Sequence, residues 1–99
     1  MNETQLRILE ILNTGRFNPK TADEIVDELG LPYDRTNVAI RNEIKSMRRD
    51  FDQLIGSSNE GFFIIQDEED LNVTLRHLSS RVRETNMIIE RLENAFRSR

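Results

Sequence analysis

The stretch DRTNVAIRNEIKSMRRDF, which runs from Asp34 to Phe51, carries two stripes of residues at helical spacing. The apolar stripe recurs at intervals of four, three and four and consists of Ile40, Ile44, Met47 and Phe51. The second stripe is cationic and amide-bearing and consists of Arg35, Val38, Asn42, Lys45 and Arg49. At about 100° per residue the two stripes face in nearly opposite directions on one helix. We therefore expect the apolar face to lie in a core and the cationic face to point away from it.

The sequence before this stretch predicts two shorter helices. The first spans about residues 3–14, and its apolar face consists of Leu6, Ile8, Leu9, Ile11 and Leu12. Gly15 is expected to terminate it, and the tripeptide at residues 16–18 suits a short extended piece.

The second helix is expected over residues 22–29. Thr21 has the properties of an N-cap, and Glu24 three residues later completes a capping box. Gly30 ends this helix, and GLPYD forms the turn from which Asp34 is expected to cap the third helix, which runs to about Asp50.

The period of the pattern changes after the third helix. LIGSSNEGFFII, residues 54–65, places two apolar runs around a polar loop bracketed by glycines, which predicts a β-hairpin. Asp67 then has the position of an N-cap, followed by acids in the first turn, where the helix dipole favours them. No proline or glycine interrupts the chain from there to Phe96, so a long last helix is expected.

Three helices followed by a two-stranded hairpin is the order of a winged helix-turn-helix domain, whose third helix lies in the DNA major groove. The expected fold class is mainly α with a small β-hairpin. We expect a winged helix-turn-helix domain over residues 1–66, followed by a long, coiled-coil-like C-terminal helix over residues 67–99.

The cationic stripe suits the chemistry of base edges. Arginine can bind guanine bidentately, the Asn42 amide can bind adenine, and Val38 can contact a thymine methyl group. Arg41 lies on the flank of this face and Arg48 nearer the core side, so both are expected to reach phosphates. The alternative is a solvated amphipathic helix, because charged residues opposite a core are common.

The expected hairpin tip carries Ser57, Ser58 and Asn59, which can hydrogen-bond a phosphate or a minor-groove edge. It carries no cation, and phosphate would repel Glu60, so we expect its contribution to DNA binding to be small. The alternative is a polar turn in which Gly61 supplies a positive φ.

Three segments carry a resemblance to a known family: ILNTGRF (11–17), ADEIVDELGL (22–31) and VAIRNEIKSMRRDFDQLIGSSNEGFFI (38–64). They resemble the N-terminal winged-helix domain of biotin operon repressors, and more closely the small winged-helix proteins of bacteriophages. The latter share the pattern I-x-S-S-x-x-G-aromatic and a long C-terminal helix. The resemblance covers about residues 5–66 and implies a DNA-binding fold. No biotin-ligase domain is present, so no enzymatic activity carries over, and the turn GLPYDRTN is longer than usual.

The last helix has a heptad seam, with spacings that alternate between four and three. Its members are Leu71, Leu75, Leu78, Val82, Thr85, Ile89, Leu92 and Phe96. A helix of about 30 residues is roughly 45 Å long, which exceeds the width of the expected domain. We therefore expect a homodimer through this seam. The alternative is that the helix folds back over its own domain and covers the first helix.

Composition narrows the function. The 99 residues include no cysteine and one histidine, His77, which is expected to be exposed at an outer heptad position. The sequence thus has too few cysteine and histidine residues for the usual metal sites, cofactor sites and nucleophile pairs, so we expect no enzyme and no small-molecule ligand. No apolar run is long enough to span a membrane and no signal peptide is evident, so a cytoplasmic protein is expected.

The net charge of −4 disfavours indiscriminate nucleic-acid binding, yet 12 of the 14 cations are arginine, which suits phosphate and guanine. The expected function is sequence-specific binding of double-stranded DNA by a homodimeric transcription regulator of phage or bacterial type. The alternative is a winged-helix protein-interaction module, acting in phage DNA replication or packaging, that does not read DNA sequence.

Overall fold

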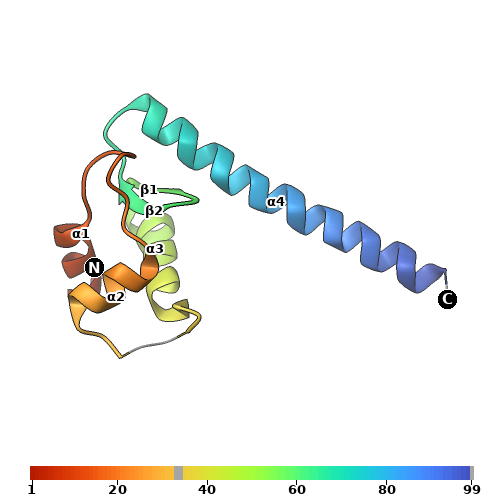
Figure 1. The fold of residues 1–99 in the computed structure, drawn as a ribbon, viewed down its shortest axis with the longest axis horizontal. Coiled ribbons are helices and arrows are strands. Elements are labelled where there is room, and N and C mark those ends of the chain that lie inside the picture. The colour runs from red at the N-terminus through yellow and green to blue at the C-terminus, as the bar shows by residue number, and fades with distance from the viewer. Residues whose placement is uncertain (33–34, 99) are drawn as a thin grey trace.

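The computed structural model describes residues 1–32 and 35–98. Its elements, in order, are α1 (Glu3–Ile11), α2 (Ala22–Leu29), α3 (Val38–Phe51), β1 (Ile55–Ser58), β2 (Gly61–Ile64) and α4 (Glu68–Arg97). Figure 1 shows the three short helices and the hairpin gathered near the start of α4, whose C-terminal part extends away from them. The predicted fold class is confirmed. The protein is mainly α, with a two-stranded antiparallel hairpin and a 30-residue last helix, and its topology is winged-helix-like.

The core lies where the apolar faces of α1, α2 and α3 meet the hairpin. Its largest fully buried apolar side chains are Ile8, Ile25, Ile40, Ile44, Met47, Ile55 and Phe63. The apolar stripe predicted for α3 is confirmed except at Phe51, which is 43% exposed. Phe51 is the last residue of α3, and the chain leaves the helix at Asp52 with a φ of 51°. The end of the stripe therefore extends past the core.

The predicted apolar face of α1 was too wide. Ile8 and Leu12 are buried, whereas Leu6 is 48% exposed. Leu6 lies about 200° from Ile8 around the helix axis, so the two side chains cannot both face the core. The helix also ends at Ile11 rather than near Thr14, so Gly15 does not terminate it. Gly15 instead has a φ of 92° and donates its N–H to the Ile64 carbonyl at 2.8 Å.

The predicted boundaries of α2 are confirmed. The Thr21 side chain accepts a hydrogen bond from the Glu24 N–H, the Glu24 side chain accepts one from the Thr21 N–H, and Gly30 ends the helix in the left-handed conformation. Residues 16–18 are a turn rather than the extended piece that was expected. The extended positions flank it, because Thr14 and Lys20 form isolated bridges with β2 at Ile64 and Phe62.

The start of α3 differs from the prediction. The helix begins at Val38 and its N-cap is Asn37, in the left-handed region with a φ of 54°. The Asn37 amide donates to the Asp23 carboxylate of α2 at 2.6 Å, which holds the end of the long turn. The expected capping residue, Asp34, lies outside the described residues. Arg35 therefore lies in the turn before α3 and not on its helical stripe.

The hairpin pairs Ile55 with Ile64 and Ser58 with Gly61, which leaves Asn59 and Glu60 as its two-residue turn. The glycine-bracketed segment predicted as a loop is therefore partly strand. Gly61 has a φ of 139°, in agreement with the alternative in which this glycine supplies a positive φ. The tip that extends beyond the paired residues is correspondingly short.

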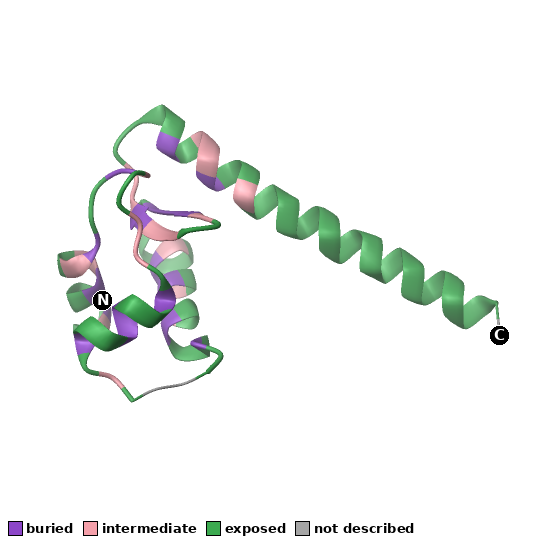
Figure 2. Cartoon of the chain, in the orientation of Figure 1, coloured by how far each residue is buried: buried purple, intermediate pink, exposed green. Residues whose placement is uncertain are grey.

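Helix α4 begins as predicted, with the Asp67 side chain accepting a hydrogen bond from the Asp70 N–H at 2.8 Å. Only its first turns pack on the domain, chiefly through the buried Asp70 and Thr74. Every described residue after position 78 is exposed, and Figure 2 shows this half of the helix entirely in the exposed class. The alternative in which α4 folds back over α1 is therefore wrong. Among the described residues no helix is long and apolar enough to cross a membrane.

Candidate nucleic-acid interface

The outward face of α3 forms one wall of an open groove of about 570 Å³. The other walls come from β2 and α4, and the lining residues are Val38, Arg41, Asn42, Ile44, Lys45, Arg48, Arg49, Phe62, Leu78 and Arg81. Five of these are cations and none is an acid. Four members of the predicted stripe, Val38, Asn42, Lys45 and Arg49, are thus brought together in this groove with their side chains exposed.

Arg35, the fifth member of the stripe, is exposed in the turn before α3 and does not line the groove. The prediction placed it at the first position of the helix, directly after the expected N-cap Asp34, whereas the helix starts three residues later at Val38. Its guanidinium therefore belongs to a separate surface, next to the N-terminal end of α3.

Arg49 is the one groove cation with an ion-pair partner among the described residues. Its Nε and Nη2 donate to the two Asp50 carboxylate oxygens at 2.9 and 3.1 Å. These hydrogen bonds raise the pKa of Arg49 and, together with the Ser46 hydroxyl, lower the pKa of Asp50. Because the Asp50 carboxylate pairs with the Arg49 guanidinium, it offsets part of the positive charge at the C-terminal end of α3 in the groove.

Arg48 lies deeper than its neighbours on α3. Its Nε donates to the Ile55 carbonyl of β1 at 2.9 Å, and burial, aided by the nearby Arg81 guanidinium, lowers its pKa. The Nη2 atom is buried and has no hydrogen-bond partner among the described residues. Arg48 thus ties α3 to the hairpin while part of its guanidinium is left unpaired.

The three residues expected at the hairpin tip have different surroundings. Ser57 is buried in β1, where its N–H donates to the Thr74 hydroxyl at 3.1 Å and its Oγ lies 3.2 Å from Nδ1 of His77. The placement of Ser57 on the exposed tip was therefore wrong, because alternation along β1 turns its side chain toward α4. Ser58 is half-buried and its hydroxyl accepts from the Glu60 N–H, whereas Asn59 is exposed in the turn.

Two contributions from α4 were missed by sequence reasoning. Leu78 and Arg81 line the groove, and His77, expected in solvent, is half-buried against Ser57. A signal for them exists in the sequence. Asp70, Thr74, His77 and Arg81 recur at spacings of four, three and four, one residue before the apolar seam. This polar stripe is the face that α4 turns toward its own domain.

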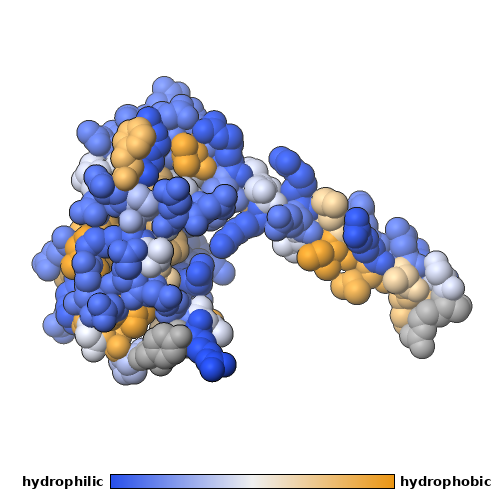
Figure 3. All heavy atoms as spheres, viewed as in Figure 1, coloured by the Kyte–Doolittle hydropathy of each residue, from blue (hydrophilic) through white to orange (hydrophobic). Residues whose placement is uncertain are grey.

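The seam itself is exposed. Its members Val82, Leu92 and Phe96 are 61%, 65% and 70% exposed, and Figure 3 shows hydrophobic side chains gathered along the projecting part of α4. Met87 and Ile88 add to this surface.

No protein-family model, curated protein or solved structure matched this chain.

Proposed function

We propose that this protein binds double-stranded DNA as a homodimer and acts as a transcription regulator. The observation that carries the proposal is the α3 face, on which Val38, Asn42 and Lys45 are exposed beside a groove that gathers five cations and no acid. Within a winged-helix-like topology this face belongs to the element that enters the major groove. The resemblance of the sequence to phage winged-helix proteins and to the DNA-binding domain of biotin operon repressors supports the same reading.

The amide of Asn42 and the small apolar side chain of Val38 suit adenine and the thymine methyl group, respectively. Arg41 and Lys45 suit phosphates or guanine, and neither has an ion-pair partner among the described residues. Buried Ser57 is excluded from the proposed contacts, and Asn59 is the hairpin residue best placed to reach a duplex.

Dimerisation is the second half of the proposal. The face of α4 that contacts its own domain is polar, at Asp70, Thr74 and His77, so the domain leaves the apolar seam uncovered. Leaving so many aliphatic side chains in water is unfavourable, at about 25 cal/mol for each Å² of apolar surface. A second copy of the same heptad helix would cover them. Two linked domains also compensate for the few cations that one domain offers to phosphates.

An interaction module is the second candidate, favoured by the net charge of −4 and by the acid at Glu60 on the hairpin turn. Substitution of the exposed α3 side chains distinguishes the two candidates. Such substitutions should weaken DNA binding by a transcription regulator, but they should leave partner binding unchanged in an interaction module that binds only through α4.

The testing experiment is selection of bound sequences from random duplex DNA at a stated salt concentration, followed by affinity measurement on the selected site. Asn42→Ala should weaken binding by about 1–3 kcal/mol and relax preference at one base pair. Lys45→Ala should weaken binding to all sequences alike. If Lys45 contacts a phosphate, this variant should also reduce the dependence of log affinity on log salt concentration by about 1 in slope. Arg83→Ala removes a cation of α4 outside the groove and is the matched control. Failure to enrich any sequence, with both variants binding like the parent, would reject the assignment.

A further inference from the structure

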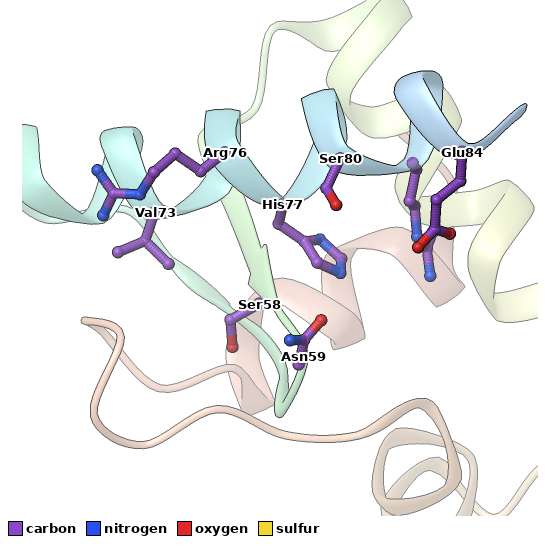
Figure 4. Close-up of a pocket in the computed structure, with 8 residues that line it drawn as sticks. Ser58, Asn59, Val73, Arg76, His77, Ser80 and Glu84 are labelled. Atoms are coloured by element: carbon purple, nitrogen blue, oxygen red, sulfur yellow. The ribbon is translucent and has the colours of Figure 1, made fainter. Parts of the chain in front are cut away.

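A small cavity of about 180 Å³ lies where α3, the hairpin and α4 meet. Its polar lining comes from all three elements: Arg41 and Arg48 of α3, Ser58 and Asn59 of the hairpin, and His77 and Arg81 of α4. Figure 4 shows the adjoining depression between α4 and the hairpin, which shares Ser58, Asn59 and His77 with the cavity; the His77 ring points from the helix toward the hairpin. No described carboxylate lines this cavity, and Glu84 lines the adjoining depression instead.

No ion pair among the described residues involves the arginines of the cavity. The Nη2 atom of Arg48 is buried without a partner in the described part of the chain. A second guanidinium group, that of Arg81, is close enough to lower the pKa of both Arg48 and His77. A buried donor that makes no hydrogen bond is costly, and like charges close together add to that cost. An anion in the cavity would remove both penalties.

Acids are available elsewhere in this protein and are paired with other arginines. Arg16 has Asp67 and Asp70, and Arg76 has Glu69. Within the described residues, Arg41, Arg48 and Arg81 form no ion pair with any carboxylate. Three arginines that line one cavity with no described carboxylate in its lining therefore suit an anion that comes from outside the chain.

We propose that this cavity binds a phosphate group, held by the guanidinium groups of Arg41, Arg48 and Arg81. Guanidinium forks match phosphate oxygens bidentately, and the Ser58 hydroxyl, the Asn59 amide and a protonated His77 are further donors beside them. The phosphate is either a backbone phosphate of bound nucleic acid or a free phosphate-containing molecule. For a backbone phosphate the inference rests on the proposed function and extends the phosphate contacts expected of Arg41 and Arg48 to Arg81 and His77 of α4; for a free phosphate-containing molecule it does not rest on that function.

His77 is the single histidine of the chain and is therefore an unambiguous NMR reporter inside the cavity. Inorganic phosphate, titrated at constant ionic strength against chloride, should raise the pKa of His77, because a nearby negative charge favours the imidazolium. Arg81→Gln should weaken phosphate binding about tenfold, as loss of a charge-assisted hydrogen bond predicts. Arg81 is exposed and its side chain forms no described ion pair, so this variant should fold. Arg83→Gln is the control and should bind like the parent.

The second arm replaces phosphate with a short duplex and identifies the source. A rise in the His77 pKa on duplex binding, with a salt slope lowered by about 1 in Arg81→Gln, supports the cavity as a backbone-phosphate site. A response to inorganic phosphate without one to the duplex supports a free phosphate ligand, and counts against the proposed function but not against the cavity. An unchanged His77 pKa in both arms, or equal phosphate binding by the parent and Arg81→Gln, overturns the inference.

Discussion

The carboxylate of Asp70 lies 2.9 Å from the guanidinium of Arg16, and this pair joins the start of α4 to the turn between α1 and α2. The same carboxylate accepts the backbone N–H of Arg16 at 3.1 Å and that of Gln66 at 2.9 Å. Asp70 is 1% exposed. An acid expected from the sequence only to complement the helix dipole thus anchors α4 to the domain.

Asp70→Asn should lower the melting temperature and loosen the start of α4. Burial alone raises the pKa of Asp70, but the hydrogen bonds from Gln66 and Arg16 outweigh it, so the folded-state pKa is lowered. A lowered pKa contributes stability that is present above the unfolded value of about 3.9 and is lost as pH falls through the folded value. The melting temperature of the parent should therefore fall more steeply below about pH 4 than the melting temperature of the variant. Equal acid sensitivity would contradict the assignment.

Gly56→Ala should destabilise the protein by about 1–3 kcal/mol, as overpacking of a close contact does. A Cβ at this position would collide with the Phe63 ring and lie 2.8 Å from the Thr74 hydroxyl, so α4 and β1 would have to separate. Chemical denaturation measures the loss. Ser79→Ala, at an exposed position of α4, is the control and should stay within about 0.5 kcal/mol of the parent.

Ile89→Asp combined with Leu92→Asp should convert the proposed dimer to monomers, because both positions lie in the exposed seam. Loss of the link should reduce DNA affinity by roughly 10²–10⁴ while the domain stays folded. Sedimentation and circular dichroism provide the measurements. Ser80→Asp with Asn94→Asp adds the same charge on the opposite side of the helix and should leave the dimer intact. Because dimer formation depends on protomer concentration, a parent that sediments as a monomer at about tens of micromolar would defeat the proposal.

The stability of the protein should fall as pH decreases through about 6.5, the unperturbed pKa of histidine. Burial, then Arg81 and Arg48, lower the pKa of His77, so at such pH the unfolded chain binds more protons than the folded one. Stability consequently rises with pH in this window and is fully present above it. Ser57 of β1 lies 3.2 Å from the His77 ring. The other polar groups that line the two pockets beside His77 are Arg41 of α3, Ser58 and Asn59 of the hairpin, and Arg76, Ser80 and Glu84 of α4. His77→Gln should remove this component of the pH profile measured by urea unfolding and leave the one near pH 4 unchanged.

Much of the fold followed from local spacing. The stripe at Ile40, Ile44 and Met47 predicted the buried face of α3, and the Thr21–Glu24 capping box predicted where α2 begins. These predictions succeed because the angle between side chains on one helix, and the hydrogen bonds of its first turn, depend only on residues a few positions apart. The uninterrupted run after Asp67 predicted the length of α4 for the same reason.

Spacing did not decide which face of α4 meets the domain. The polar stripe beginning at Asp70 and the apolar seam beginning at Leu71 differ by one residue, or about 100° around the axis. Hydrophobicity alone favours docking through the seam. In the folded protein α4 packs on the domain through the polar stripe. Asp70 pairs with Arg16, 54 positions away in the sequence, and Thr74 packs closely against Gly56, which has no side chain. Contacts between residues so distant in sequence exist only once the domain has folded. They are what bring Arg81 beside Arg48 and leave the seam exposed.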